Sequence, residues 1–134
     1  MINFQFIGTK KIHLKSTVNW IKKVVSSEHK KIGEIVFVFC NDNYLLRKNI
    51  EFLKHDTLTD VITFNYCNAE QISGDILISV ERVQENSKIF KTKFSIELNR
   101  VMVHGLLHLL GYDDKTQADA KIMRSKEEFY LSNI

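Results

Sequence analysis

Two histidines four positions apart, His104 and His108, are the side chains in this sequence best suited to hold a metal ion. They lie in residues 103–114, V-H-G-L-L-H-L-L-G-Y-D-D, where apolar residues recur at helical spacing. Side chains four residues apart share one face of a helix, so both imidazoles can reach the same ion. With 5 histidines in the chain, roughly 0.2 such pairs are expected by chance. The surrounding leucines strengthen the case, because a buried imidazole needs partners for its ring nitrogens and a metal ion can supply one.

The chain can return a carboxylate to the two histidines just after this helix. Gly111 favours a left-handed backbone turn that ends the helix, and Asp113 and Asp114 follow closely. Alternate side chains of an extended segment point to opposite sides, so one aspartate is expected to face the histidines and the other to face solvent or a helix amide. Two imidazoles and one carboxylate would form a three-ligand site with a coordination position left for water. Such an open position allows catalysis.

The residue after the first histidine, Gly105, argues against one kind of metal chemistry. In the H-E-x-x-H motif of zinc peptidases, this position holds the glutamate that acts as general base. Without that glutamate, the group that activates water or substrate must come from elsewhere in the chain. Asp75, in a G-D-I turn at the start of a predicted strand, is a candidate for this catalytic role. An ordinary turn aspartate is the alternative interpretation.

The rest of the sequence predicts the elements that would position this motif. Apolar residues alternate along some segments and recur every three or four residues along others. Strand patterns cover residues 2–7, 34–40, 59–66 and 74–79, and helical patterns begin at Ser16 or Thr17 and at Asn41 or Asp42, and cover roughly 80–91, 94–110 and 116–131. The segment 34–40 is apolar on both faces, which indicates a central strand, and the last two strands could pair antiparallel. This order predicts a single α+β domain, a mixed four-stranded sheet packed with about five helices.

Length, composition and charge fit one globular domain. The 134 residues are 44% hydrophobic and 26% charged, which is ordinary for a folded domain. No run of about 20 apolar residues could cross a membrane, and the N-terminal residues predict a strand rather than a signal peptide. Cys40 and Cys67 are expected to be free thiols in a reducing cytoplasm. The net charge of +3 is too small to establish a nucleic-acid partner, although basic pairs such as Lys22-Lys23 could contact phosphates.

Three segments of the chain resemble the YbeY-type endoribonucleases, a family of single-domain rRNA maturation factors. Residues 104–114, H-G-L-L-H-L-L-G-Y-D-D, resemble the family's H-G-x-L-H-L-x-G-Y-D-H box. The segment from Asp56 to Phe64, D-T-L-T-D-V-I-T-F, is similar to the family's D-x-P-T-D-V-L-S-F, and S-G-D-I, from Ser73 to Ile76, is similar to its G-D-I strand start. The three segments occur in family order, and the predicted helices on either side fit the same layout.

This resemblance implies a metal-dependent, single-strand-specific endoribonuclease that acts in 16S rRNA 3′-end maturation and ribosome quality control. Zinc is the metal usually assigned to the family, and two of its histidine ligands carry over to His104 and His108. Asp114 replaces the family's last histidine, and its oxygen would admit Mn or Fe more readily. Because the family spacing from the first histidine selects Asp114 as the third ligand, Asp113 is left as the expected cap of the helix that begins near Thr116. The implied partners are single-stranded RNA, rRNA and the small ribosomal subunit in the cytoplasm, with no DNA or membrane partner expected.

One departure from the family pattern concerns the substrate. The family's N-x-x-Y-R motif aligns with Asn49 to Leu53, so leucine stands in the arginine position and no phosphate-binding cation can be assigned there. This replacement favours an alternative function, a metal-stabilised binding protein of ribosome assembly with weak or no catalysis. A metal hydrolase of another substrate, such as a peptide, is a third interpretation, and Gly105 argues against it.

Overall fold

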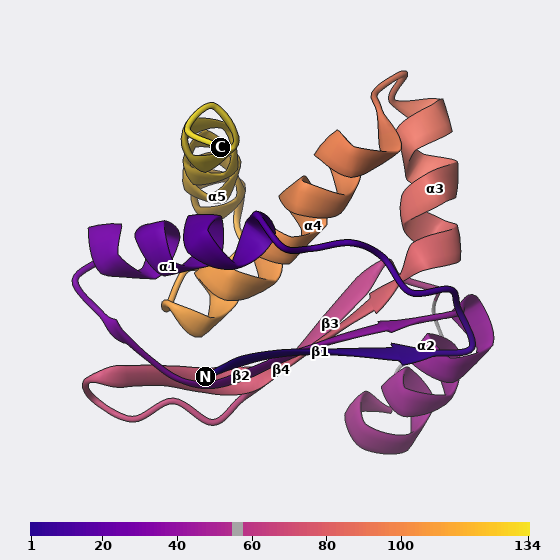
Figure 1. Cartoon of the computed structure of the whole chain (residues 1–134), viewed down its shortest axis with the longest axis horizontal. Coiled ribbons are helices and arrows are strands. Elements are labelled where there is room, and N and C mark those ends of the chain that lie inside the picture. The colour runs from indigo at the N-terminus through magenta and orange to yellow at the C-terminus, as the bar shows by residue number, and fades with distance from the viewer. Residues whose placement is uncertain (55–57) are drawn as a thin grey trace.

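A mixed four-stranded sheet with strand order β1-β2-β4-β3 forms the centre of the fold (Figure 1). The structure, a computed structural model, describes residues 1–54 and 58–134. The strands are β1 (Ile2–Ile7), β2 (Lys31–Cys40), β3 (Val61–Asn65) and β4 (Gln71–Ser79). The helices are α1 (Thr17–Ser27), α2 (Asp42–Lys48), the π-helical turn η1 (Asn49–Leu53), α3 (Val80–Ile89), α4 (Phe94–Leu109) and α5 (Gln117–Leu131). The described residues thus confirm the predicted α+β class, with a mixed sheet and five α-helices.

The sheet is parallel except at one edge. β1 pairs with β2, and β2 with β4, in parallel. β3 pairs antiparallel with β4, so that Val61 lies opposite Ile78 and Asn65 lies opposite Gly74. This pairing of the last two strands agrees with the sequence, as does the interior position of residues 34–40 within β2. An interior strand is covered on both faces, which explains the β-branched and aromatic composition of β2.

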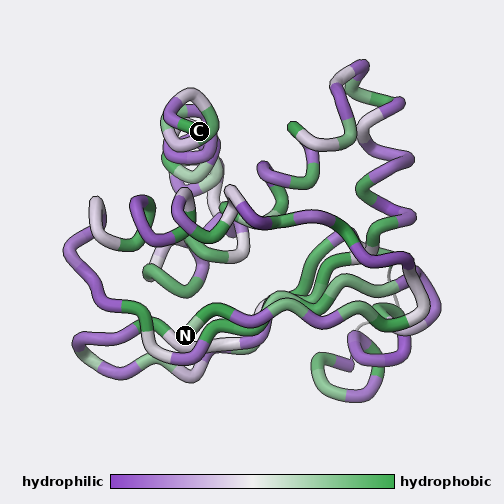
Figure 2. Tube along the Cα trace, viewed as in Figure 1, coloured by the Kyte–Doolittle hydropathy of each residue, from purple (hydrophilic) through white to green (hydrophobic). Residues whose placement is uncertain are grey.

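The helices divide the apolar residues of the sheet between two cores. Figure 1 shows α1, α4 and α5 over one face and α2 under the other, and Figure 2 shows apolar residues gathered along the strands. The larger core lies with α1, α4 and α5 and includes Ile21, Phe37, Phe39, Ile76, Met102, Leu106 and Met123. The smaller core, on the face of α2, consists of Val38, Cys40, Leu45, Ile62 and Leu77. Successive residues of a strand such as Ile76 and Leu77 therefore serve opposite faces.

Gly105 lets α4 lie close to the sheet. A Cβ atom added to this residue would be 2.6 Å from Cγ2 of Ile76 on β4, which is closer than real side chains pack. The position is completely buried and faces the strand rather than solvent. A glutamate at this position would enter the core, so the arrangement of H-E-x-x-H peptidases is incompatible with the packing as well as absent from the sequence.

Element boundaries differ from the sequence patterns by up to three residues, since β3 begins at Val61 rather than at 59 and β4 begins at Gln71 rather than at 74. β2 begins at Lys31, three residues before its apolar run. Of the two residues expected to start α2, Asn41 is the N-cap, since its side chain accepts a hydrogen bond from the backbone N–H of Tyr44. Ser16 occupies the N-cap position of α1, but its side chain makes no capping hydrogen bond. The side chain of Ser16 therefore does not cap α1.

Two expectations drawn from composition can be compared with the fold. Cys40 is buried and Cys67 half-buried, and both are free cysteines, as predicted. Among residues 1–54 and 58–134, no helix is both long enough and apolar enough to span a membrane.

Candidate metal centre

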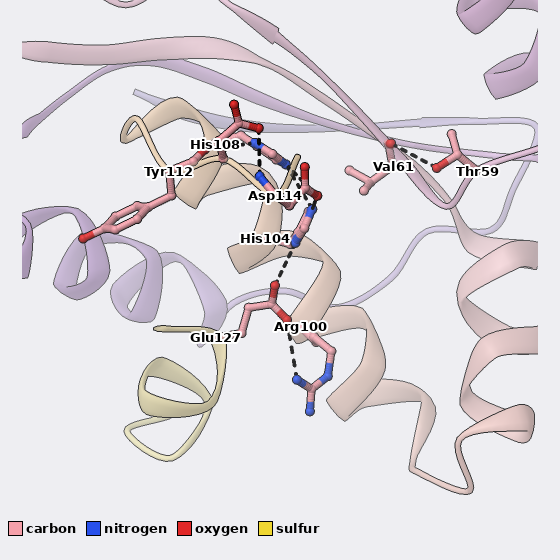
Figure 3. Close-up of polar contacts among 9 residues, drawn as sticks. Thr59, Val61, Arg100, His104, His108, Tyr112, Asp114 and Glu127 are labelled. Carbon is pink, nitrogen blue, oxygen red and sulfur yellow. Dashed lines mark hydrogen bonds and ion pairs between the residues drawn. The ribbon is translucent and has the colours of Figure 1, made fainter. Parts of the chain in front are cut away.

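α4 and the turn that follows it bring His104, His108 and Asp114 together, as Figure 3 shows. α4 ends at Leu109, and Gly111 has a φ of 103°, in the left-handed region predicted for it. The chain then doubles back, so that the aspartate lies against the two histidines of the last turns of α4. All three side chains are partly exposed, with 24%, 27% and 43% of their surfaces accessible in chain order. The group is thus open to a substrate as well as to an ion.

The three ligand atoms have the separations of a metal site. Nε2 of His104 lies 3.1 Å from Nε2 of His108. Oδ2 of Asp114 lies 3.4 Å from the first nitrogen and 3.6 Å from the second. Ligand atoms about 2.0–2.1 Å from a tetrahedral zinc ion are about 3.3 Å apart. The group could therefore hold a metal ion with little rearrangement.

The other ring nitrogens explain why these two point inward. Nδ1 of His108 is 3.1 Å from the carbonyl oxygen of Tyr112, and Nδ1 of His104 is 2.7 Å from Oε2 of Glu127. A carbonyl or carboxylate oxygen accepts, so each Nδ1 donates and each neutral ring presents its Nε2 lone pair. Two lone pairs at 3.1 Å beside a carboxylate oxygen repel each other unless a cation or a proton lies between them. This set of two nitrogens and one oxygen fits zinc and other borderline metals.

Negative charge around His104 also favours a cation. Burial lowers the pKa of this histidine, but the hydrogen bond and charge of Glu127, with the charges of Asp114 and Asp60, raise it above its ordinary value. Asp60 is itself held in a desolvated position, since burial raises the pKa of its carboxyl group. Its Oδ2 accepts a hydrogen bond from Nδ2 of Asn86 at 3.4 Å. A divalent ion would relieve the mutual repulsion of these carboxylates.

Glu127 of α5 is a site residue that the sequence did not reveal. It is 8% exposed, and its Oε1 lies 3.5 Å from Nη1 of Arg100, whose Nε lies 3.7 Å from Oε1 of Glu97. The arginine balances the charge of these two buried carboxylates. A signal was present in the sequence, because Glu127 falls on the buried stripe of α5 between Met123 and Tyr130. A carboxylate in such a stripe needs a partner.

Two cavities meet at the candidate ligand group, which consists of His104, His108 and Asp114. One, of about 310 Å³, is lined by Asp60, Arg100, His104, Asp114, Arg124 and Glu127, among others. The other, of about 610 Å³, follows β3 and is lined by Leu53, Asp60, Thr63, His104, His108 and Asp114, among others. Asp60 borders both cavities, and its place in the D-T-L-T-D-V-I-T-F segment did not by itself indicate a role for it. Asp56, the first residue of that segment, lies outside the described residues.

Asp75, the residue expected to be catalytic, does not line either of the two cavities at His104. On β4, Ile76 packs under α4, so Asp75 and Leu77 point to the opposite face of the sheet. Asp75 lines a separate cavity of about 310 Å³ with Tyr44 and Lys48, and burial raises the pKa of its carboxyl group. The alternation of side chains along one strand separates it from the histidines.

Asp113 was expected to cap α5, but it does not. Thr116 is the N-cap, and its hydroxyl oxygen accepts from the backbone N–H of Asp119. Oδ1 of Asp113 instead accepts from the backbone N–H of Asp114 at 2.8 Å. The first aspartate therefore shapes the turn, and the second faces the histidines.

A carboxylate at the end of α1 anchors this turn from the other side. Glu28 accepts hydrogen bonds from the hydroxyl of Tyr112 at 2.6 Å, from Nζ of Lys126 at 3.1 Å and from the hydroxyl of Tyr130. The carbonyl oxygen of the same Tyr112 accepts from His108. Burial raises the pKa of Glu28, but these three hydrogen bonds outweigh it and the net shift is downward. The cluster ties α1, α5 and the ligand-bearing turn together.

We expect Glu28→Gln to lower the free energy of unfolding by about 1.5–3 kcal/mol at neutral pH, the usual contribution of a hydrogen bond to a charged group. The pKa of Glu28 is lower in the folded than in the unfolded chain, so its contribution is complete above the unfolded pKa. It is lost as the pH falls through the folded pKa. Urea unfolding at neutral and acidic pH measures this, with exposed Glu34→Gln as the control. A difference from the native chain that is the same at both pH values would contradict the assignment.

The fold and the site define a small α+β protein with a candidate H-x-x-x-H metal centre, completed by a carboxylate after a glycine turn. Residues 4–134 match the family described as Endoribonuclease YbeY, and the chain belongs to that family. A Flavobacterium psychrophilum protein named Endoribonuclease YbeY is 56% identical over 84% of this chain and 81% of its own length. The Flavobacterium johnsoniae protein of the same name is 49% identical over 96% of this chain and 93% of its own. The family resemblance read from the three motifs is confirmed.

The fold of this chain is also similar to that of a solved structure. The solution structure of a Thermotoga maritima protein aligns with a TM-score of 0.70 at 27% identity, covering 96% of this chain and 87% of that one. Nearly the whole chain, and not only the histidine-bearing segment, therefore shares its architecture with a protein of known structure.

Proposed function

We propose that this protein is a metal-dependent endoribonuclease that cleaves single-stranded RNA, with His104, His108 and Asp114 as the ligands of the metal ion. The observation that carries the proposal is the convergence of two Nε2 atoms and one carboxylate oxygen at 3.1–3.6 Å, with both Nδ1 atoms engaged elsewhere. Membership of the Endoribonuclease YbeY family supports RNA as the substrate and hydrolysis as the reaction.

The chemistry divides between the ion and the chain. A bound metal ion would polarise a phosphate oxygen or lower the pKa of a water molecule. Glu127 and the carbonyl of Tyr112 hold the two imidazoles in one tautomer. Asp60 borders both cavities at the ligand group, so its carboxylate is the group we assign to accept a proton from the attacking water. Zinc fits this donor set, and the Asp114 oxygen also suits Mn or Fe.

The biological substrate we propose is the 3′ end of 16S rRNA in the small ribosomal subunit, in the cytoplasm, rather than DNA. This part of the proposal is supported by the family resemblance, and the modest net charge of +3 is compatible with it. Weak, salt-sensitive binding to free RNA is expected if the ribosome supplies most of the specificity.

A second function, as a metal-stabilised binding protein of ribosome assembly with little catalysis, is favoured by one observation. Leu53 is 40% exposed and lines the larger cavity beside His104 and His108. The resemblance places the family's arginine at this position, where a guanidinium would hold a phosphate. An apolar side chain at this position offers no charged hydrogen-bond donor to a phosphate.

The two functions predict different results when the metal is removed. Protein purified without chelator should contain about one metal ion per chain and cleave a single-stranded RNA, and dialysis against a chelator should abolish cleavage while circular dichroism keeps a native-like spectrum. Adding the metal back should restore activity. Complete unfolding of the metal-free protein, without RNA cleavage by the loaded form, would support the binding protein, because binding energy is then folding energy. Cleavage of a generic peptide would indicate a different substrate class.

A further inference from the structure

The larger cavity at the metal centre has an unusual wall, the free edge of a β-strand. β3 is the outermost strand beside β4, and no further strand pairs with it in residues 1–54 and 58–134. Val61, Thr63 and Asn65 of this strand line the cavity together with His104 and His108. Edge strands present unpaired N–H and C=O groups that are ready to bind another extended chain.

The register of the sheet shows which backbone groups face the cavity. The N–H of Tyr66 donates to the carbonyl of Ser73, and the N–H of Ser79 donates to the carbonyl of Asp60, so even-numbered residues of this segment bond to β4. Hydrogen-bonded and non-bonded pairs alternate in an antiparallel ladder. The N–H and C=O groups of the odd-numbered residues, from Val61 to Asn65, therefore project from the free edge.

We propose that the free edge of β3 is a substrate-binding site, at which the backbone N–H groups of Thr63 and Asn65 donate hydrogen bonds to phosphate or base oxygens of a single-stranded RNA. The inference rests on the proposed endoribonuclease function. It assigns a binding role to uncharged backbone donors on one strand. It also places the bound chain along β3, with its scissile group at the His104 end.

The composition of the cavity wall supports backbone recognition. Among the described residues that line it, none is a lysine or arginine, and Leu53 occupies the place of the family's arginine. Apart from the two histidines and the carboxylates of Asp60 and Asp114, the polar residues of the wall are Thr59, Thr63 and Asn65, which are uncharged. Away from the metal ligands, an anionic chain held here would be bound by neutral donors, as phosphates often are by backbone N–H groups. Successive outward N–H groups on a strand are about 6.8 Å apart, similar to the spacing of neighbouring phosphates in an extended single strand.

The start of β3 is the part of the strand that shares both cavities with His104. Asp60 and Val61, at the start of the strand, line the cavity that also contains His104 and Glu127. At its far end, Sγ of Cys67 lies 3.4 Å from the carbonyl oxygen of Leu109 in the last turn of α4. Figure 3 shows Val61 on the strand beside Asp114 and His104, with Thr59 hydrogen-bonded to its carbonyl oxygen. That hydrogen bond engages the carbonyl oxygen of Val61, and the outward N–H groups of Thr63 and Asn65 lie further along the same cavity wall.

Thr63→Pro tests the proposal, because proline removes one outward N–H and is tolerated at non-bonded positions of edge strands. We expect about tenfold weaker binding of a single-stranded RNA and a correspondingly higher KM, with metal content and kcat close to those of the native chain. Thr63→Val, which keeps the N–H and removes only the hydroxyl, should bind more nearly like the native chain. Equal affinity of the proline variant and the native chain would overturn the proposal.

Amide hydrogen exchange on the unaltered protein gives a second test that does not depend on how the proline variant folds. With the metal-loaded protein and a single-stranded RNA analogue that resists hydrolysis, exchange of the Thr63 and Asn65 amides should slow, whereas the Ile62 and Phe64 amides are protected by β4 with or without RNA. Unchanged exchange rates of the Thr63 and Asn65 amides when the protein is saturated with RNA would overturn this binding site. Protection by an extended peptide but not by RNA would also overturn it. Failure of the native, metal-loaded chain to cleave RNA would instead overturn the proposed function and is measured separately.

Discussion

Replacing either histidine of the ligand group, by His104→Ala or His108→Ala, is expected to abolish metal retention while leaving most of the fold intact. Each variant removes one of three ligand atoms that lie within 3.1–3.6 Å of each other. Removing even a hydrogen-bond partner of a ligand lowers metal affinity about 10–100-fold, so losing the ligand itself should exceed about 100-fold. Asp114→Ala should have the same effect. Elemental analysis after gel filtration measures the retained metal, and circular dichroism reports the fold.

Two further substitutions test the third ligand specifically. Asp114→His restores the donor set of the family pattern, so it should retain zinc and shift preference away from Mn. Asp113→Ala is the matched control, since its carboxylate bonds the backbone N–H of Asp114 and does not face the histidines. It should keep metal with a small loss of affinity. Loss of metal from Asp113→Ala, together with retention by Asp114→Ala, would show that the ligand has been misassigned.

Glu127 is expected to have the next largest effect on metal affinity, although it would not touch the ion. Its hydrogen bond to Nδ1 of His104, at 2.7 Å, directs the Nε2 lone pair toward the other ligands. Glu127→Gln keeps an acceptor and loses the charge, so metal affinity should fall about tenfold. Glu127→Leu loses both and should approach a 100-fold loss. Competition with a chromogenic chelator measures these constants.

The matched control for both variants is Glu128→Gln, on the exposed side of α5 one residue further on. Long-range nitrogen–proton NMR spectra of the metal-free protein separate positioning from general destabilisation, because they identify the tautomer of His104. The Nδ1–H form should dominate in the native chain and in Glu127→Gln, and mix with the Nε2–H form in Glu127→Leu. Native metal affinity in Glu127→Leu, or an equal loss in Glu128→Gln, would contradict the positioning role.

The absence of an H-E-x-x-H glutamate also has a structural meaning here. Gly105 lies against Ile76, so this position is where α4 packs on the sheet and not part of the site. The groups that modulate the proposed centre come from other elements, with Asp60 before β3 and Glu127 on α5. Any proton transfer must therefore be arranged across the fold and not within one helix.

The features that the sequence determined by itself are those set by local geometry. Helical spacing places His104 and His108 on one face whatever surrounds them. Gly111 is the residue that most readily takes a left-handed backbone, so the return of the chain toward α4 was also predictable. The strand periodicity and the family motifs were sufficient for the α+β class and for choosing Asp114 over Asp113.

Only the tertiary structure decided which distant residues meet the site. The register of β4 sends Ile76 to α4 and Asp75 to the opposite face, and a shift of one residue would exchange them. Glu127 reaches His104 only because α5 packs along α4, a contact between helices that periodicity does not specify. β3 lines the cavity beside His104 and His108 because the strand order places it at the edge of the sheet. Local patterns specify the direction of a side chain within its own element, whereas its partners depend on how the elements pack.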